Sequence, residues 1–318
     1  MCGIAGILDR NAQPNTQILQ VMINALYHRG PDAGAIVSRN HIALGHRRLS
    51  IIDLDDRSNQ PMQDDYSGAL IVFNGEIYNY LDVRRELESL GVSFYTKSDT
   101  EVILKAYDKF GIGCLKKLNG MFAFAIWDAQ RQQLFLARDR AGEKPLFYSW
   151  LPSGALAFAS ELKALQLHPE VYRDIDTAAI RNFLTLNYIP QDYCILKGVH
   201  KLPPAHFLLI EHGKPRPAPV EYWDLAENYK TKSSYLSENE AVEALDHLVE
   251  DSVRIRLAGD VPLGAFLSGG IDSSIITSVF MRLRPDSQNR TYSIGFNEPT
   301  YSELPEARSV ANHVQSTH

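Results

Sequence analysis

Apolar residues in the first two hundred positions follow two different spacings. The segment NTQILQVMINALYHRG carries them at helical intervals up to a glycine-proline pair, which predicts an amphipathic helix that ends near residue 30. The segment SDTEVILKAYDKFG has Ser98 and Glu101 at the spacing of a capping box and stops at Gly111, which predicts a second helix. The stripe of the first segment consists of Ile18, Leu19, Met22, Ala25 and Leu26.

Strand patterns separate these helices. The run GALIVFNGEIYN is β-branched and aromatic, and MFAFAIWDAQRQQLFLARD predicts a hairpin that turns around residues 128–131. A second hairpin is predicted in PLFYSWLPSGALAFAS, with its turn at residues 152–154. Antiparallel strand pairs with helices grouped around them favour layered sheets flanked by helices.

The pattern changes after a proline-rich stretch, KLPPAHFLLIEHGKPRPAPVEYWD, which predicts a strand pair and then a linker. From residue 237 a capping box of Ser237 and Glu240 leads a helix whose apolar face carries Val242, Leu245, Leu248, Val249 and Val253. A strand in GAFL, a helix in SSIITSVFMRLR and a strand in TYSIGF then predict a parallel unit with a crossover helix. We therefore predict a first domain over residues 2–215, a linker over 216–236 and a second domain over 237–318.

Composition narrows the class of protein. The 318 residues are 45% hydrophobic and 22% charged, with a net charge of −6, which is typical of a globular protein and gives no basis for binding nucleic acid or an acidic membrane. The chain shows no signal peptide and no run long enough to span a membrane. Three cysteines without metal spacing argue against a disulfide framework and predict a cytoplasmic protein.

The stretch LSGGIDSS predicts a phosphate site. A strand followed by two glycines and a helix start directs backbone N–H groups at an anion, and the serines add hydroxyl donors. Asp272 could bind a magnesium ion that bridges phosphates. An ordinary serine-capped turn explains the same composition, but the string SGGIDSS resembles the pyrophosphate-binding loop of the ATP pyrophosphatases.

A cysteine directly behind the initiator methionine suggests a second kind of chemistry. If Met1 is removed, Cys2 carries a thiol and a free α-amino group, whose pKa of about 7.7–8.0 suits it to accept the thiol proton. Asn74 and Gly75 could form an oxyanion hole, and Arg48 could bind a carboxylate. Asp99 and Glu76 could receive an α-ammonium group. Each has a structural explanation when taken alone, but together they describe a site for glutamine.

The order of motifs closely resembles the glutamine-hydrolysing asparagine synthetases. The matching strings are MCGIAGI, HRGPD, HRRLSIID, NGEIYN, SDTEVIL, NGMFAFAIWD, ARDRAGEKPLFY, FASELKAL, KLPPAH and LSGGIDSS. The resemblance implies an N-terminal nucleophile hydrolase fold, an α+β sandwich of αββα layers, followed by the start of an α/β domain of the ATP-pyrophosphatase (adenine nucleotide α-hydrolase-like) type. It also implies that the first domain releases ammonia from glutamine. The second would use ATP and Mg²⁺ to adenylate aspartate, giving asparagine, AMP and pyrophosphate.

Site residues follow from the same resemblance. Cys2 is the implied nucleophile, Asn74 and Gly75 the implied oxyanion hole, and Arg48, Asn74, Gly75, Glu76 and Asp99 the implied glutamine site. The implied ATP contacts are Leu267, Ser268, Gly269, Gly270, Asp272, Ser273 and Ile294, with Asp272 as the metal ligand. Residues 28–32 (HRGPD) are a family signature for which the sequence justifies only a helix end and a turn. Cys114 and Cys194 are expected to be buried and structural.

The family extends beyond the last residues, ANHVQSTH, so we expect an incomplete synthetase domain whose acceptor-binding residues lie after residue 318. The implied partners are small molecules (glutamine, aspartate and ATP), with neither nucleic acid nor membrane, and a homodimer is compatible with the sequence. Two alternatives stay open. One is a glutamine-binding module or glutaminase without synthesis, and the other is a related amidotransferase or amide synthetase that acts on a different carboxylate.

Overall fold

The structure, a computed structural model, describes residues 1–191, 193–230, 237–285, 289–298 and 300–318. Its contacts divide the chain into one unit over Met1–Lys230 and another over Thr231–His318. The predicted linker over 216–236 falls partly outside the described residues. Its described part contains strand β12 (Val220–Glu221) and helix α6 (Leu225–Lys230). The predicted domain boundaries remain a prediction.

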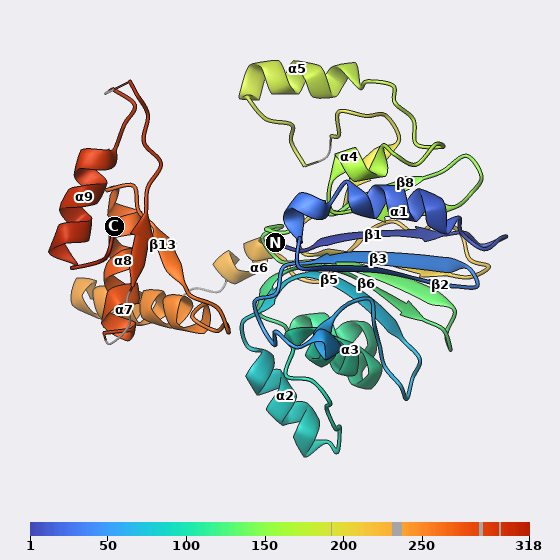
Figure 1. Ribbon diagram of the computed structural model, residues 1–318, viewed down its shortest axis with the longest axis horizontal. Helices are drawn as coiled ribbons and strands as arrows, with labels where there is room; N and C mark the ends of the chain where they lie inside the picture. Colours follow the sequence, from blue (N-terminus) through green and yellow to red (C-terminus); the bar gives the residue numbers. More distant parts are fainter. Residues whose placement is uncertain (192, 231–236, 286–288, 299) are drawn as a thin grey trace. The chain divides into compact units, whose positions relative to one another are not determined.

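Two six-stranded antiparallel sheets form the first unit (Figure 1). One has the order β10-β8-β9-β1-β3-β2 and the other β12-β11-β7-β6-β5-β4. The strands of the first sheet are β1 (Gly3–Leu8), β2 (Ala33–Arg39), β3 (Ile42–Arg48), β8 (Phe147–Trp150), β9 (Leu156–Ala159) and β10 (Val199–Lys201). Those of the second, besides β12, are β4 (Met62–Gln63), β5 (Leu70–Ile77), β6 (Gly120–Asp128), β7 (Gln133–Arg138) and β11 (His206–Glu211).

Helices cover the outer faces of both sheets and complete four layers (Figure 1). Helices α1 (Thr16–Asn24) and α4 (Leu162–Leu165) pack on the first sheet, and α2 (Tyr80–Ser89) and α3 (Asp99–Phe110) pack on the second. The unit also contains α5 (Thr177–Leu186) and three 3-10 helices, η1 (Tyr27–Arg29), η2 (Asp56–Ser58) and η3 (Gly111–Lys116). This arrangement confirms the predicted αββα sandwich.

Alternation along β1 shows how the sequence fixes the layers. Ile4 and Leu8 pack in the core between the two sheets, whereas Ala5 and Ile7 pack against α1 on the outer face. All six residues of β1 are buried, as expected for a strand with packing on both faces. The hairpins β6–β7 and β8–β9 form at the predicted turns.

The start of α3 corrects one prediction. Ser98 Oγ accepts from the backbone N–H of Glu101, but the Glu101 carboxylate does not return to Ser98. It accepts instead from Thr96 N at 2.7 Å and Thr96 Oγ1 at 2.6 Å, within the loop before the helix. The spacing therefore predicts the start of α3 correctly, but the Glu101 carboxylate stabilises the loop before the helix and does not complete a capping box.

The second unit contains the predicted parallel strand pair, β13 (Gly264–Phe266) and β14 (Arg290–Tyr292). Helices α7 (Glu238–Ile255), α8 (Ile271–Leu283) and α9 (Leu304–His313) surround the pair, and α7 begins with the predicted capping box. Only part of the apolar face of α7 packs against a core. Val249 and Val253 join the small core, while Val242, Leu245 and Leu248 are exposed. None of the described helices is long and apolar enough to cross a membrane.

Candidate active site

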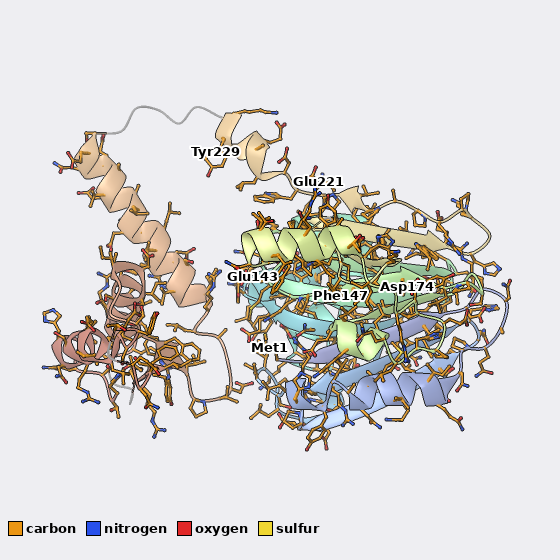
Figure 2. The ribbon with its side chains drawn as sticks, turned by 90° about the horizontal axis from the view of Figure 1, so that it is seen from above. Met1, Glu143, Phe147, Asp174, Glu221 and Tyr229 are labelled. Carbon is orange, nitrogen blue, oxygen red and sulfur yellow. The ribbon has the colours of Figure 1, made fainter. Side chains whose placement is uncertain are left out.

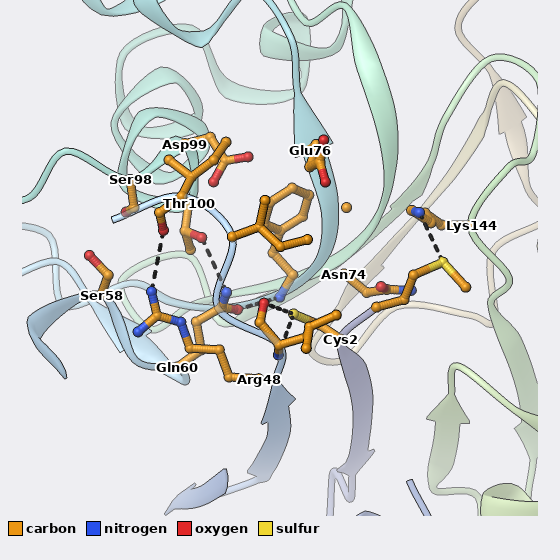
Figure 3. A pocket seen from close by; sticks show the side chains of 16 residues that line it. Cys2, Arg48, Ser58, Gln60, Asn74, Glu76, Ser98, Asp99, Thr100 and Lys144 are labelled. Atoms are coloured by element: carbon orange, nitrogen blue, oxygen red, sulfur yellow. Dashed lines mark hydrogen bonds between the residues drawn. The ribbon is translucent and has the colours of Figure 1, made fainter. Parts of the chain in front are cut away.

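The period of two along the strands brings the predicted glutamine residues together. Cys2 precedes Ile4 by two positions, and Asn74 follows Val72 by two, and both reference residues face the core between the sheets. Arg48 follows the inward-facing Leu44 on β3 by four positions, which also places it on the inner face. The side chains therefore point into one end of the inter-sheet layer, where they line a cavity of about 50 Å³ (Figure 3).

This cavity contains every predicted glutamine residue: Cys2, Arg48, Asn74, Gly75, Glu76 and Asp99. Its wall also includes Met1, Ser58, Gln60, Thr100 and Lys144. Ligand pockets typically measure about 300–1,000 Å³, so the cavity is too small for an amino acid while Met1 occupies its wall. Removal of Met1 would enlarge it.

Cys2 is half-buried at the start of the central strand β1. Its thiol donates to Leu49 O at 3.6 Å, and Leu49 N donates to Sγ at 3.4 Å. Burial raises the pKa of the Cys2 thiol, so the resting group is the neutral thiol. A nearby base must therefore accept its proton before it attacks a carbonyl group.

Asn74 presents a buried amide with no bond to satisfy it. The residue is fully buried, and within the described part of the chain neither Oδ1 nor Nδ2 has a hydrogen-bond partner. Gly75 beside it leaves no room for a side chain, since a Cβ there would lie 2.1 Å from Met121 O. An unpaired amide donor that lines the same cavity as a thiol can serve as a donor of an oxyanion hole.

Arg48 is buried and engaged by its own loop. Nη1 donates to Asp55 O at 3.0 Å and to Asn59 Oδ1 at 2.8 Å. Nη2 donates to Ile52 O at 3.3 Å and to Asp53 O. The terminal N–H groups thus hold residues 52–59 against the end of β3. A carboxylate would bind this guanidinium through Nε or by displacing loop carbonyls.

Acidic groups form the opposite wall (Figure 3). Burial, with Glu76 adding to it, raises the pKa of Asp99 to about 7, and Asp99 Oδ2 accepts from Ile77 N at 3.0 Å. Burial also raises the pKa of Glu76 and lowers the pKa of Lys144. Perturbed carboxylates in a cavity are typical of functional sites, and two of them suit an α-ammonium group.

Three residues around this site escaped the sequence analysis. Lys144 is buried and its Nζ lies 3.2 Å from Met1 Sδ. Figure 2 shows Met1 and Glu143, the neighbour of Lys144 in the chain, at the same end of the first unit. Arg29 Nε donates to Cys2 O at 2.8 Å, and Arg29 Nη1 donates to Glu161 Oε1 at 2.8 Å. All three lie within the quoted motifs, but only the fold shows that those motifs meet at Cys2.

The predicted ATP residues are only partly brought together. A cavity of about 350 Å³ in the second unit is lined by Leu267, Ser268, Ser273 and Ile294, with Phe266, Tyr292, Ser293 and Glu303. Gly269, Gly270 and Asp272 do not line it. Gly269 has a φ of +85°, and a Cβ there would lie 2.6 Å from Glu306 Cβ. The glycine therefore permits the turn, and its neighbour Gly270 caps α8 without a side-chain bond.

The donor set of this loop fits a phosphate group. The N-terminus of α8 offers backbone N–H groups, and the hydroxyls of Ser268 and Ser273 lie 3.0 Å apart beside it. Asp272 is an exposed carboxylate in the first turn of α8. Among the described residues no three His, Cys, Asp or Glu side chains gather to hold a metal. Asp272 would thus bind Mg²⁺ only together with phosphate oxygens.

A four-layer sandwich with a thiol at the start of its central strand defines an N-terminal nucleophile amidotransferase. Comparison with known families agrees: the family model "Glutamine amidotransferase domain" matches residues 1–223, and "Asparagine synthase" matches residues 244–318. The chain therefore belongs to the glutamine amidotransferase family, with an asparagine synthase segment after the first domain. The predicted resemblance to glutamine-hydrolysing asparagine synthetases is confirmed.

The relatives differ in name and in the share of their length that this chain covers. A putative asparagine synthetase [glutamine-hydrolyzing] 2 of Methanocaldococcus jannaschii is 36% identical over 100% of this chain and 64% of its own length. Amidase chry2 of Gibberella zeae is 36% identical over 89% of this chain and 43% of its own. The chain thus spans 43% to 64% of the length of these relatives.

A solved structure shares the fold. The glutamine phosphoribosylpyrophosphate amidotransferase from B. subtilis has a TM-score of 0.53 and 16% identity, covering 93% of this chain and 67% of its own.

Proposed function

We propose that the chain hydrolyses glutamine at Cys2 and supplies the ammonia to ATP-dependent amide synthesis. The observation that carries the proposal is the unpaired, fully buried amide of Asn74 in the cavity of the Cys2 thiol. Leaving such a group without a bond costs about 1–3 kcal/mol. A substrate oxyanion would provide the missing acceptor and recover that cost at the moment of reaction.

The reaction follows from groups at the cavity once Met1 is removed. The α-amino group of Cys2 takes the thiol proton, and Sγ forms a bond to the side-chain carbonyl carbon of glutamine. Asn74 Nδ2 and the Gly75 N–H donate to the resulting oxyanion. The C–N bond then breaks, the α-ammonium group returns its proton to the leaving nitrogen as ammonia, and water hydrolyses the thioester to glutamate.

Local charges favour a neutral amine. Burial lowers the pKa of the Met1 α-amino group, and Arg29 and Lys144 act in the same direction. After removal of Met1, the free α-amino group would belong to Cys2, whose carbonyl oxygen accepts a hydrogen bond from Arg29. A base that is neutral near pH 7 is what the neutral thiol needs.

Synthesis is the second half of the proposal. Ser268, Ser273 and the N-terminus of α8 would hold the phosphates of ATP, Leu267 and Ile294 would contact its adenosine, and Asp272 would bind Mg²⁺. ATP would supply the adenylyl group that activates a carboxylate, with aspartate as the acceptor and asparagine as the product. Assays for asparagine and AMP would distinguish this reaction from the alternative, amide synthesis on a different carboxylate acceptor. The free thiols of the three cysteines support a cytoplasmic location.

The deciding experiment replaces Cys2 by alanine. We expect C2A to abolish glutamine hydrolysis while the far-UV circular dichroism spectrum is unchanged, because Cys2 lies outside the strand ladder. A diazo-ketone analogue of glutamine should label Cys2 and leave the buried Cys114 and Cys194 unmodified. Burial raises the pKa of Cys114 to about 12, which makes that thiol inert. Full activity in a preparation that retains Met1 by intact mass would refute the amine mechanism.

A further inference from the structure

The signature HRGPD (residues 28–32) has no role in the proposed reaction, yet it packs against the site. Asp32 N donates to Arg48 O at 3.1 Å, and Asp32 Oδ2 accepts from Ser50 N at 2.8 Å. A Cβ on Gly30 would lie 2.4 Å from the backbone carbon of Arg47. The signature therefore lies directly against residues 47–50, the segment whose Leu49 contacts the thiol.

Arg29 connects this signature to the nucleophile. Its Nε donates to Cys2 O at 2.8 Å and its Nη1 donates to Glu161 Oε1 at 2.8 Å. The Arg29 side chain is only 8% exposed and that of Glu161 is 23% exposed, so the guanidinium side of the pair is shielded from solvent. Bonds in which a charged group takes part are shorter and stronger than neutral ones. Cys2 lies outside the β1 ladder, which starts at Gly3, so this contact holds a carbonyl that the sheet does not.

Glu161 is itself held on a rigid frame. The preceding residue, Ser160, accepts from Ile4 N through Oγ at 3.0 Å and donates its own N–H to Ile4 O at 2.9 Å. His28 Nε2 lies 3.0 Å from Glu161 Oε1, and Lys163 Nζ lies 3.3 Å from Oε2. Burial acts to raise the pKa of Glu161, but hydrogen bonds from Arg29 and His28 hold it below its ordinary value. The group is therefore a carboxylate at neutral pH.

We infer that Glu161 is a positioning residue for the nucleophile: it fixes the Arg29 guanidinium, which in turn fixes the carbonyl of Cys2 and so the direction of Sγ. The inference rests on the proposed function, because it assigns Glu161 a part in glutamine hydrolysis without contact to glutamine. Glu161 does not line the cavity. Its loss should therefore affect the orientation of the thiol more than the binding of substrate.

The test compares E161A and E161Q with the control K163M in the full chain, with an N-terminus at Cys2 verified by intact mass. K163M removes the exposed cation that contacts Glu161 and leaves the Arg29 bond in place. We expect E161A to lower kcat about 100-fold, the effect of displacing a reacting group by roughly 1 Å. KM should change little. E161Q keeps one acceptor oxygen and should fall between, and K163M should match the unmodified chain.

Two labelling rates separate positioning from general support. The diazo-ketone analogue of glutamine needs an oriented thiol, so its labelling of Cys2 should fall with kcat in E161A. Iodoacetamide needs only access, so its rate should stay unchanged or rise.

An unchanged kcat in E161A, or a joint fall of kcat, both labelling rates and the melting temperature, would overturn the inference. If E161A does not fold, E161Q decides by the same criteria. An unmodified chain that neither hydrolyses glutamine nor takes the diazo-ketone label would instead refute the proposed function, and the inference with it.

Discussion

Replacing Asn74 by alanine should strongly slow turnover without destabilising the protein. The amide has two buried polar atoms without partners in the described part of the chain, and each such group costs about 1–3 kcal/mol. The space left by the amide adjoins a cavity of about 50 Å³, so water can fill it and the penalty for an empty void is small. We therefore expect the free energy of unfolding to stay constant or rise by about 1–3 kcal/mol. We also expect kcat to fall about 100- to 1,000-fold.

The first unit can be followed alone in this experiment. All three tryptophans of the chain, Trp127, Trp150 and Trp223, belong to Met1–Lys230, so their fluorescence during urea titration reports the unfolding of that unit. Asn79 offers a matched control, because its Nδ2 donates to Lys117 O at 2.9 Å and its Oδ1 accepts from Asn119 N at 2.8 Å.

N79A should lower the free energy of unfolding by about 1–2 kcal/mol and leave kcat unchanged. A loss of more than about 1 kcal/mol in N74A would show that the Asn74 amide is already satisfied in the resting protein, which would refute the reasoning.

Three further changes test other parts of the structure. Since Asp99 has a pKa of about 7 and must be ionised to bind an ammonium group, kcat/KM should fall as the pH drops below about 7, and D99N should lose this limb. The contribution of protonated Asp99 to the stability of the folded protein has the opposite pH dependence. It is complete below about pH 4 and is lost as the pH rises through 7. R48A should speed tryptic cleavage at Arg57 by freeing its loop, whereas R47A should not. G269A should strain the loop before α8 by about 1–3 kcal/mol and speed hydrogen exchange in α8. G270A should be tolerated, because the atom nearest to its Cβ, Ser268 Oγ, would lie 3.4 Å away, which is an ordinary contact distance.

The sequence predicted the layers of the sandwich from local strand and helix patterns, and the motifs of the resemblance named residues that the structure brings to one cavity, whose assignment to glutamine stays a prediction. Strand alternation places Asn74 on the inner face of β5, and the position of Cys2 needs no structure at all. The strands β2 and β3 were missed, since Gly34, Gly45 and charged residues interrupt their apolar pattern. Their strand character comes from pairing with each other and with β1, a tertiary effect that overrides propensity.

Long-range contacts were beyond the sequence. The pKa of Asp99 depends on burial behind β5, and Arg29 meets Glu161 across 132 positions. Arg48 shows the other limit. Its residue type suggested a carboxylate grip, but the turn after β3 brings carbonyls to its guanidinium that no spacing rule would predict. The assignment of Arg48 to glutamine stays a prediction.

The place of β1 in the first unit sets the time scale on which the nucleophile can move. The strand pairs on both edges, with β3 and β9, and is buried on both faces, so its amides should exchange with solvent only through opening of most of the unit. Residues 49–59 belong to no strand and are held mainly by side-chain bonds, those of Arg48 together with Asp32 to Ser50 N and Asp53 to Lys97 N, so they can rearrange more often than β1. The site therefore combines one wall that is stationary during turnover with one that can yield to an incoming substrate. Sequence drift in residues 49–59 would alter entry to the site while the thiol keeps its place.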